Sequence, residues 1–410
     1  MNRVKKVVVI GGGFAGIAAV KELERAGLPL AITLISKNDH FEYYPALYKL
    51  VTGALAIEVS VLLRTIFPRS TVHVVQETFE GINTDEQYVT LSGGVQIQYD
   101  YVILSLGSET NYFNIPGLPD QSFSFKSVDE ALRLKEHFKK LIATSGTLSK
   151  DELVERLHVI VVGGGPSGVE LAGDLRVFLT RLAKLYSVDP NIITIDLVES
   201  NNRILPTLPE NVSRVATARL RKMGVNIFTG RTLQSQDVAD ITMKDMHMKA
   251  HTLVWTAGTR INPLFEKIPK VEMTERKRVV VSDTLTLPSH NNVFVIGDGA
   301  GTTFSGLAQT AIVDGKFAAK TIIDDIKGNR RRVYVPKAPS FVIPIGNNWA
   351  LFSRGTFLMT GFFPWLLRSA VDFKYFASIL PLGYVLKVYV RGAKYRRLEK
   401  EYREKNTTRN

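Results

Sequence analysis

The sequence predicts an α/β protein with two domains built on parallel sheets, followed by a C-terminal region of amphipathic helices. Two runs of β-branched residues end in glycine-rich turns, at 11–16 and at 163–168. A third run, at 292–296, ends in Gly297 and Asp298. Both glycine turns fit the pattern G-x-G-x-x-G between a strand and a helix, which is the dinucleotide-binding fingerprint. We therefore expect two Rossmann-like dinucleotide-binding domains.

Each glycine of a fingerprint has its own task. The first makes the tight turn, the second lets the backbone approach a pyrophosphate, and the third lets the helix pack close on its strand. The start of the helix offers free N–H groups and the positive end of its dipole to the phosphates. The candidate binding residues are Gly11, Gly13, Phe14, Ala15 and Gly16 in the first fingerprint, and Gly163, Gly165, Pro166, Ser167 and Gly168 in the second.

The segment after the first fingerprint predicts a helix over 15–26 and a strand over 31–36. An acidic residue that binds ribose normally ends this strand. Ser36 and Lys37 stand at that place instead. Ser36 can hydrogen-bond to a ribose hydroxyl, and Asp39 is the alternative partner.

The segment after the second fingerprint predicts a helix from Pro166 to about Tyr186 and a strand over 193–198. Glu199 follows this strand, and its carboxylate can accept hydrogen bonds from both hydroxyls of an unphosphorylated ribose. A 2′-phosphate would meet like charge there, so NAD(H) is expected to be preferred over NADP(H). Arg203 lies close by in the sequence, and an arginine there could bind a 2′-phosphate, so a preference for NADP(H) stays open.

The third glycine turn indicates which site takes a flavin. The strand at 292–296 places Asp298 on a turn between two glycines. Such an aspartate can hold the ribityl hydroxyls of FAD, for which an NAD site has no use. An ordinary aspartate in a turn is the alternative. Together with the two fingerprints, this turn predicts that FAD binds the first domain, which the chain completes after an inserted NADH-binding domain.

Composition excludes several kinds of redox centre. The 410 residues contain no cysteine. Disulfides, cysteine-ligated zinc, iron–sulfur clusters and redox-active dithiols are therefore excluded. No metal site is predicted.

The net charge is concentrated at the C-terminal end. Residues 327–410 hold 17 lysines and arginines but four acidic residues, so this stretch accounts for the whole net charge of +13. A basic tail can bind nucleic acid, bind anionic lipid or simply be solvated. No groove-reading motif accompanies the charges, so no nucleic acid is expected.

The residues around those charges favour a lipid surface. Residues 362–390 are rich in aromatic and aliphatic side chains, but the uncharged stretches that overlap this segment, 355–367 and 375–386, are shorter than the roughly 20 residues of a spanning helix. Pro364 and Pro381 fit the first turns of two short helices. We expect these helices to lie in the membrane interface, with aromatic residues inward and Lys/Arg toward anionic headgroups. Packing in the soluble core or in a dimer is the alternative.

Several further segments carry a family resemblance. They are His-Phe-Glu-Tyr-Tyr-Pro-Ala-Leu-Tyr at 40–48, Leu-Ser-Leu-Gly-Ser-Glu-Thr-Asn-Tyr-Phe at 104–113, Ile-Pro-Gly at 115–117, Trp-Thr-Ala-Gly at 255–258 and Leu-Ala-Gln-Thr-Ala at 307–311. With the two fingerprints, they resemble the type II, single-subunit, non-proton-pumping NADH:quinone oxidoreductases, which are two-dinucleotide flavoproteins.

The resemblance implies a domain plan and a set of partners. FAD would bind non-covalently to a domain formed by 1–115 and 276–340, NADH would bind to 116–275, and 341–410 would attach to the membrane. The partners would be NADH, a quinone and an anionic membrane surface, with the protein peripheral on the cytoplasmic face of the cell membrane. A homodimer is usual in such enzymes.

The same resemblance assigns residues to the sites. Glu170 would stand close to the nicotinamide and the flavin, although an acid that stabilises the first turn of a helix would look the same in the sequence. Glu170 and Gln309 are the candidate catalytic residues. The resemblance adds Pro45, Leu47, Gly107, Ser108, Gly297, Asp298, Ala308 and Gln309 to the FAD site, and Glu170, Glu199, Ala257 and Gly258 to the NADH site.

The quinone site departs from the family pattern. The family typically shows Ala-Gln-x-Ala-x-Gln beside the flavin. Here the second glutamine is replaced by Val313, with Asp314 following. A buried site that has lost one amide should bind a quinone carbonyl less tightly or use another donor. Gln309 is then either a quinone contact or a core-lining residue.

Three other functions remain to be weighed. A sulfide:quinone oxidoreductase needs cysteines and is excluded. An NADH-dependent reductase of a small electron-carrier protein would use the basic tail to dock an acidic partner. A membrane-associated NAD(H)-sensing flavoprotein would change its assembly on reduction.

Overall fold

The computed structural model describes residues 3–69, 71–145, 148–388 and 390–392. The chain forms two compact units, which are described separately. Unit 1 comprises Met1–Glu42, Ser60–Glu109 and Thr259–Pro339, and unit 2 comprises Tyr43–Val59, Thr110–Gly258 and Ser340–Asn410. These units group residues by contact, so the domain boundaries expected near 115, 275 and 340 stay predictions.

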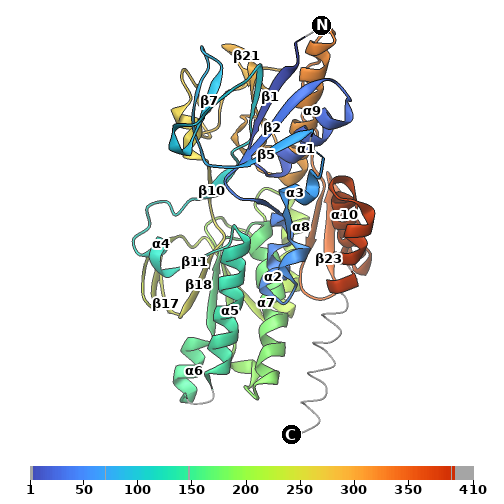
Figure 1. Cartoon of the computed structure of the whole chain (residues 1–410). Helices are drawn as coiled ribbons and strands as arrows, with labels where there is room; N and C mark the ends of the chain where they lie inside the picture. The colour runs from blue at the N-terminus through green and yellow to red at the C-terminus, as the bar shows by residue number, and fades with distance from the viewer. Residues whose placement is uncertain (1–2, 70, 146–147, 389, 393–410) are drawn as a thin grey trace. The chain divides into compact units, whose positions relative to one another are not determined.

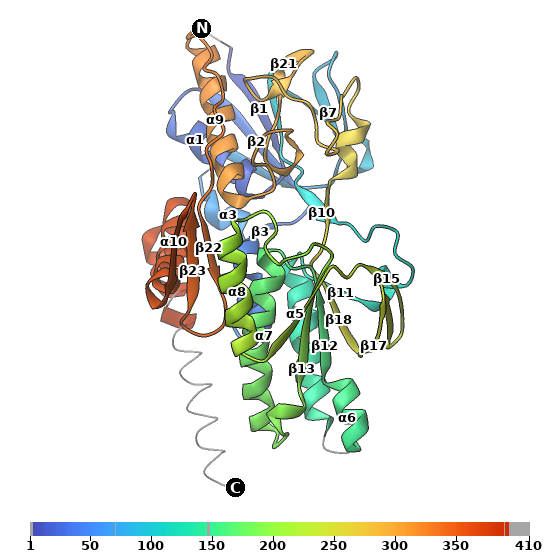
Figure 2. The same ribbon diagram turned by 180° about the vertical axis from the view of Figure 1, so that it is seen from behind.

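Unit 1 is built on a six-stranded sheet (Figure 1). Its order is β20-β21-β9-β1-β2-β5, and all neighbouring strands are parallel except β20 and β21. Helices α1 (Phe14–Arg25) and α9 (Ala308–Ile326) lie side by side in both Figure 1 and Figure 2. The strands are β1 Lys5–Ile10, β2 Leu30–Ser36, β5 Val72–Gln76, β9 Tyr101–Leu104, β20 Thr286–Leu287 and β21 His290–Val295.

A glycine explains the close approach of α1 and α9. A β-carbon at Gly315 of α9 would lie 2.1 Å from the carbonyl oxygen of Ala15 in α1. Because glycine has no side chain, the backbones of α1 and α9 can come into direct contact at this position. The rest of unit 1 includes an antiparallel sheet of β6 (Phe79–Asn83), β7 (Tyr88–Leu91) and β8 (Gln96–Gln98), whose apolar side chains join the core of the parallel sheet.

Unit 2 is built on a five-stranded parallel sheet with the order β11-β18-β12-β13-β14. These strands are β11 Phe123–Ser124, β18 Thr252–Trp255, β12 His158–Val162, β13 Thr194–Glu199 and β14 Val225–Thr229. The main helices are α2 Leu47–Val51, α5 Val128–Ala143, α7 Pro166–Leu185 and α8 Glu210–Lys222. An antiparallel sheet of β15 (Leu233–Asp237), β16 (Asp240–Met243) and β17 (Met246–Lys249) packs into the same core.

The remaining short elements connect these sheets. They are β3 His40–Glu42, β4 Ser60–Leu62, α3 Leu63–Ile66, β10 Ser108–Thr110, α4 Leu118–Gln121, α6 Lys150–Arg156 and β19 Thr259–Ile261, with 3-10 turns η1 Tyr44–Ala46, η2 Ala56–Glu58, η3 Ser92–Gly94, η5 Pro190–Ile192, η6 Pro263–Lys267 and η7 Gly297–Gly299.

The α/β fold with two Rossmann-like sheets is confirmed, and the C-terminal region holds a sheet that the sequence analysis did not predict. Strands β22 (Phe341–Pro344), β23 (Ala350–Arg354) and β24 (Phe357–Gly361) form an antiparallel sheet before the first C-terminal helix. Helix α10 (Phe362–Ile379) has Pro364 in its first turn, but at 18 residues it is not short. Residues 382–388 and 390–392 are helical after Pro381.

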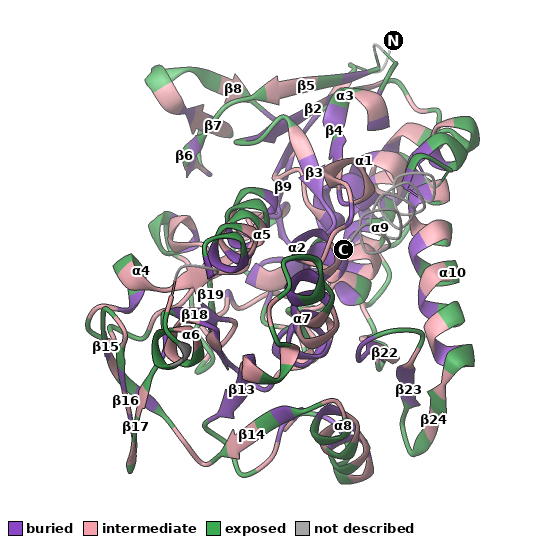
Figure 3. Ribbon diagram, turned by 90° about the horizontal axis from the view of Figure 1, so that it is seen from below, coloured by how far each residue is buried: buried purple, intermediate pink, exposed green. Residues whose placement is uncertain are grey.

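Helix α10 buries two of its charged residues and exposes several of its apolar ones. Arg368 and Asp372 are buried, whereas Phe362, Phe363 and Leu366 are 53%, 74% and 50% exposed. Figure 3 shows buried and exposed segments alternating along this helix. The expectation that basic residues here point toward headgroups is therefore wrong for Arg368. Within the described residues, none of the helices combines the length and the apolarity needed to cross a bilayer.

Candidate functional site

The first fingerprint forms a tight turn with a space above its second glycine. Gly11 has a φ of +106°, and a β-carbon there would lie 2.2 Å from the carbonyl oxygen of Ser105. A β-carbon at Gly16 would lie 2.0 Å from the carbonyl oxygen of Gly11. At Gly13, in contrast, a β-carbon would meet no atom within 4 Å. The first and third glycines are thus required by the fold, and the second is open to a ligand.

The second fingerprint repeats this geometry in unit 2. Gly163 has a φ of +117°, and a β-carbon there would lie 2.7 Å from the amide nitrogen of Ala257. A β-carbon at Gly168 would lie 1.8 Å from the carbonyl oxygen of Gly163, and one at Gly165 would meet no atom within 4 Å. Two separate segments of the chain therefore present the same open space in front of a helix.

The helices that start at these turns lack the usual N-terminal caps. Neither α1 nor α7 has a side-chain cap or an acidic residue in its first turn. Helix α5, by comparison, is capped by Ser127, and α6 has Ser149 and Glu152 in a capping box. Free N–H groups and an uncompensated helix dipole are what an anionic group such as a pyrophosphate binds.

A hydroxyl group fixes each fingerprint turn, and the sequence analysis did not single out either one. Ser105 Oγ donates to the carbonyl oxygens of Ile10 and Gly11, at 2.7 and 3.2 Å. Thr256 Oγ1 donates in the same way to Val162 and Gly163, at 2.9 and 3.1 Å. The sequence contains a pattern that could have revealed both residues. Each hydroxyl residue follows the end of a neighbouring strand and stands two positions before a glycine.

Glu199 is buried at the end of β13, next to the second fingerprint. Its Oε2 accepts from the amide of Gly164 at 2.7 Å. Its Oε1 accepts from the backbone and side-chain nitrogens of Asn201, at 2.8 and 2.6 Å. These bonds hold the carboxylate against Gly164, the residue before Gly165, and Asn201 is a second residue that the sequence analysis did not name.

The guanidinium group of Arg203 is hydrogen-bonded to backbone carbonyl groups. Its two terminal nitrogens donate to the carbonyl oxygens of Leu205, Pro206 and Leu208, at 3.1, 2.8 and 2.8 Å. A guanidinium with these bonds would have to break them to bind a 2′-phosphate. The alternative that Arg203 accommodates NADP(H) is therefore not supported.

The candidate ribose-binding residues at the end of β2 differ in how close they lie to the first fingerprint. Ser36 is buried, and its Oγ would lie 2.9 Å from a β-carbon at Gly12, so it borders the first fingerprint. Lys37 is exposed. Asp39 is bonded to His40 at 2.8 Å, and His40 also lies 3.4 Å from Glu42. Ser36 is thus better placed than Asp39 to border the first fingerprint.

The turn at Gly297–Gly299 lies against the first fingerprint helix, since a β-carbon at Gly297 would be 3.3 Å from that of Ala15. The Asp298 carboxylate accepts a hydrogen bond from Ser108 Oγ. The Gly297 amide donates to Asp314 at 3.1 Å. Burial raises the pKa of Asp314 to about 6, so it is mainly ionised at neutral pH.

Glu170 belongs to a buried network of charged groups in unit 2. It is the fifth residue of α7, beyond the first turn, so the interpretation as a first-turn acid is wrong. Arg368 Nη1 lies 3.4 Å from its Oε1. Arg368 also donates to the carbonyl oxygens of Val342, at 3.0 Å, and of Pro45.

Asp372 completes the network on the other side of Arg368. Arg368 Nε donates to its carboxylate at 3.0 Å, Lys49 Nζ at 2.8 Å and the hydroxyl of Tyr43 at 2.7 Å. Burial acts to raise the pKa of Asp372, but Lys49 and Arg368 outweigh it and hold the pKa below its ordinary value. Asp372 is therefore a permanent anion beside Arg368.

The pKa of Glu170 has shifted in the opposite direction. Burial raises it to about 8, although the positive charge of Arg368 acts against the shift. Burial also raises the pKa of Asp174, one turn further along α7, to about 6. Glu170 can thus take up and release a proton near neutral pH, which is a property that general acids and bases share.

Gln309 lies in the first turn of α9 and is exposed. The interpretation as a core-lining residue is therefore wrong. Val313, one turn further on, is half-buried. Most of the predicted FAD residues belong to unit 1 with Gln309, while Pro45, Leu47, Glu170 and the predicted NADH residues belong to unit 2.

Comparison with known proteins gives a consistent result. The family described as pyridine nucleotide-disulphide oxidoreductase matches residues 5–315. The chain is 30% identical over 383 residues to a type II NADH:quinone oxidoreductase of Mycobacterium tuberculosis, covering 88% of this chain and 81% of that protein. It is 30% identical over 332 residues to the type II NADH:quinone oxidoreductase of Staphylococcus aureus, covering 78% of this chain and 82% of that protein.

Solved structures show the same fold. NDH2 from Plasmodium falciparum, in complex with NADH, aligns with a TM-score of 0.85 over 96% of this chain and 98% of that one, at 19% identity. The sulfide:quinone oxidoreductase of Aquifex aeolicus aligns with a TM-score of 0.76 over 91% of each chain, at 20% identity. At these identities the likeness concerns the fold alone.

Proposed function

Since this chain belongs to the pyridine nucleotide-disulphide oxidoreductases, and among them to the type II NADH:quinone oxidoreductases, we propose that it passes hydride from NADH to FAD and electrons onward to a membrane quinone. No proton pumping accompanies this reaction. The observation that carries the proposal is the repeated open space over Gly13 and over Gly165, each in front of an uncapped helix.

The residues of unit 1 fit FAD. The open space over Gly13 and the free start of α1 suit its pyrophosphate, and the Asp298 carboxylate suits its ribityl hydroxyls. Bound FAD supplies the redox chemistry, and the protein supplies binding and orientation. We assign Gly11, Gly13, Phe14, Ala15, Gly16, Ser36, Lys37, Gly107, Ser108, Gly297, Asp298, Ala308 and Gln309 to this site. Pro45 and Leu47, which the family resemblance also implies for FAD, belong to unit 2.

The residues of unit 2 fit NADH. Glu199 is a buried carboxylate that accepts the ribose hydroxyls, and Arg203 is held by the backbone, so NADH is preferred over NADPH. Glu170, with a pKa of about 8, is the group that holds or releases a proton near the reacting atoms. We assign Gly163, Gly165, Pro166, Ser167, Gly168, Glu170, Glu199, Ala257 and Gly258 to this site.

Gln309 is the proposed quinone contact. It is exposed and lies in the first turn of α9, the helix that packs against the first fingerprint helix. Val313, which stands where the family has a second glutamine, offers no hydrogen bond. A quinone carbonyl therefore relies on one amide here, and quinone affinity should be modest.

An anaerobic titration with NADH tests the proposed function. The purified yellow protein should lose its visible flavin absorbance on addition of NADH and recover it rapidly on addition of a short-chain quinone. Loss without recovery would contradict the quinone as acceptor and point to a carrier protein or a sensor. A colourless protein that binds no added FAD would contradict the flavin assignment itself.

Replacing Glu199 by serine should raise the KM for NADH by about 10- to 100-fold, because one or two hydrogen bonds from ribose to a carboxylate are lost. The preference for NADH over NADPH should fall at the same time. This ratio is the decisive readout, since Glu199 also accepts from Gly164 and Asn201 and its loss affects stability as well. Asp237→Ala, at an exposed acid of the same unit, should change neither quantity.

We also propose that the outer face of α10 attaches the protein to the cytoplasmic face of the membrane, where it acts as a homodimer. Phe362, Phe363 and Leu366 form an exposed apolar group in the first turns of this helix. Leu382, Leu386 and Val390, spaced by four residues, are exposed in the helical segment that follows. Apolar faces of this kind insert at a lipid interface.

Replacing Phe362, Phe363 and Leu366 together by serine should lower affinity for anionic vesicles by roughly 100-fold or more, because three buried apolar side chains are lost from the lipid. Sedimentation with vesicles measures this. The matched control is serine at Leu62, Val95 and Val238, which are equally exposed elsewhere. Unchanged sedimentation of the first variant would place the attachment site elsewhere. Deleting the chain after about Phe362 is a poorer test, because Arg368 would be removed from the interior.

A further inference from the structure

The turn at Gly297–Gly299 is held by side chains from three other parts of unit 1. Arg278 Nη1 donates to the carbonyl oxygen of Asp298 at 2.9 Å, and Ser108 donates to its carboxylate. The amide of Gly297 donates to Asp314 Oδ2 at 3.1 Å. Arg278 and Ser108 are partly exposed, whereas Asp314 is completely buried.

A buried carboxylate needs partners for both of its oxygens. Asp314 Oδ2 accepts from Gly297, and Oδ1 accepts from the hydroxyl of Tyr334. Asp314 lies in the middle of α9 and follows Val313, where the chain departs from the family pattern. Asp314 is not among the residues assigned to FAD or NADH above, although it accepts a hydrogen bond from Gly297, the residue before Asp298.

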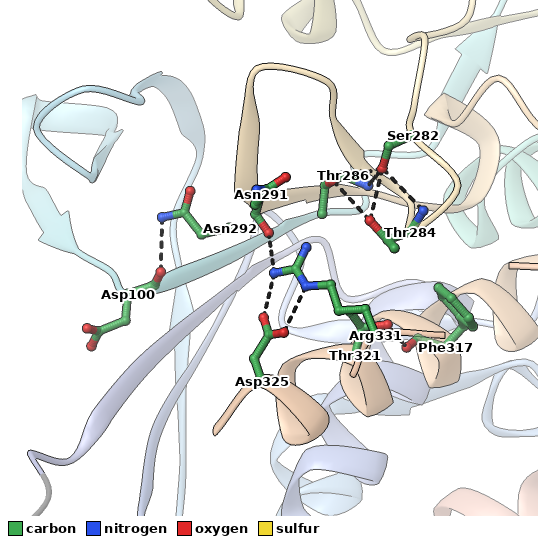
Figure 4. A network of polar contacts seen from close by, with 10 residues as sticks. All are labelled: Asp100, Ser282, Thr284, Thr286, Asn291, Asn292, Phe317, Thr321, Asp325 and Arg331. Atoms are coloured by element: carbon green, nitrogen blue, oxygen red, sulfur yellow. Dashed lines mark hydrogen bonds and ion pairs between the residues drawn. The ribbon is translucent and has the colours of Figure 1, made fainter. Parts of the chain in front are cut away.

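Tyr334 is itself fixed in position. It lies in the segment that leaves the end of α9, and its ring meets that of Phe317 edge to face at a centroid distance of 5.1 Å. Arg331 in the same segment bonds to Asp325 of α9 and to the carbonyl oxygen of Asn291 in β21, both at 2.8 Å (Figure 4). The segment that carries Tyr334 is therefore bonded to both α9 and β21, and this places the Tyr334 hydroxyl against Asp314.

The position of Asp314 is fixed as well. The next residue, Gly315, touches the backbone of Ala15, since a β-carbon there would lie 2.1 Å from the Ala15 carbonyl oxygen. Ala15 belongs to the first fingerprint helix. Helix α9 therefore packs directly on the backbone of the fingerprint helix at Gly315, and the neighbouring Asp314 bonds to the turn at Gly297.

From this geometry we propose that Asp314 is a positioning residue for FAD, which fixes the Gly297–Asp298 turn so that the Asp298 carboxylate is presented to the ribityl chain. The inference rests on the FAD site proposed above. Asp314 touches no cofactor atom in this role. It acts through the amide of Gly297, which has a left-handed φ of +71° and leads directly into Asp298.

The rate of FAD release separates this role from a general effect on stability. Asp314→Ala removes the acceptor of Gly297 and should speed FAD release by about 10- to 100-fold, as expected for a lost hydrogen bond to a charged group. Asp314→Asn should release FAD within about threefold of the wild-type rate, because its amide oxygen accepts from Gly297 and its amino group donates to Tyr334. Flavin fluorescence after dilution measures both rates.

The matched control is Asp324→Ala. Asp324 is a second buried aspartate of the same helix, paired with Arg332 at 3.2 Å and remote in sequence from the turn. Its loss should affect the unfolding temperature but not FAD release. Equal FAD release by the Asp314→Ala and Asp324→Ala variants would overturn the proposal.

A second variant covers the case in which Asp314→Ala does not fold. Tyr334→Phe removes the hydrogen bond to the other oxygen of Asp314 and should speed FAD release by about threefold to tenfold. An unchanged rate would overturn the proposal. NADH binding to unit 2, measured by nucleotide fluorescence, should remain as in the wild type in every variant. Failure of the FAD assignment is distinguishable, because the wild-type protein would then bind no flavin.

Discussion

Gly165→Ala is expected to abolish most NADH binding while leaving the protein as stable as the wild type. The backbone of Gly165 has a φ of −72°, which alanine adopts freely, and a β-carbon there meets no protein atom. The new methyl group would instead occupy the space proposed for the pyrophosphate. A clash of about 1–3 kcal/mol corresponds to a rise in the KM for NADH of about 10- to 100-fold.

Two alanine variants serve as controls for this result. Gly168→Ala places a β-carbon 1.8 Å from the carbonyl oxygen of Gly163, so it should lower the free energy of unfolding by about 3 kcal/mol. Gly13→Ala, at the equivalent open position of unit 1, should reduce FAD content instead of NADH affinity. An unchanged KM for NADH in Gly165→Ala would contradict the assignment of the second fingerprint.

Arg368→Met is expected to destabilise the protein by about 3–5 kcal/mol, because it leaves Glu170 and Asp372 buried without their shared cation. Arg368→Lys should cost less, since the charge remains, but lysine cannot reproduce a fork that also bonds to Val342 and Pro45. Chemical unfolding measures both. The control is Lys320→Met, which removes an exposed partner of Glu22 and should change stability by less than about 0.5 kcal/mol.

The same variant has a consequence for protonation. The positive charge of Arg368 lowers the pKa of Glu170, which burial has raised to about 8. In Arg368→Met that pKa should rise further, so the carboxyl group stays protonated to higher pH. The carbonyl band of the protonated acid in infrared spectra, identified by its absence in Glu170→Gln, reports the titration. A lower pKa in Arg368→Met would show that the two groups are not coupled.

Glu170 also affects stability as a function of pH. Its folded pKa of about 8 lies above its ordinary value of 4.5. The folded protein therefore binds more protons than the unfolded chain between these pH values, and this group's contribution to stability is lost as pH rises toward 8. Glu170→Gln, which does not titrate, should flatten that part of the stability profile.

The local sequence was sufficient to predict the strand–turn–helix units. The positive φ of Gly11 and the close packing of Gly16 follow from neighbouring residues and the shape of the turn. The roles of these residues toward FAD and NADH remain predictions. Ser105 and Thr256 could have been found too, because each stands two residues before a glycine in the matching segments 104–107 and 255–258.

The charged network of unit 2 could not be predicted in this way. Arg368 was grouped with the basic residues of the tail, but its partners Glu170 and Pro45 lie 198 and 323 residues away along the chain. Hydrogen bonds over such separations depend on tertiary packing, which periodicity does not reveal. The sheet of β22–β24 was missed because 341–410 was treated as one membrane-attaching region, and only the residues from 362 onward were examined for helices or strands.

Helix α10 separates two properties that most amphipathic helices combine. Its inner face combines the ion pairs of Arg368 and Asp372 with the buried side chains of Phe376 and Ile379. Its outer face carries the exposed side chains of Phe362, Phe363 and Leu366. In most surface helices the apolar face holds the fold together, so making it polar unfolds the protein. Here a second apolar group lies exposed on the outer face. Changes to these outer residues are therefore expected to alter the surface of the helix while the buried ion pairs and apolar contacts of its inner face stay as they are.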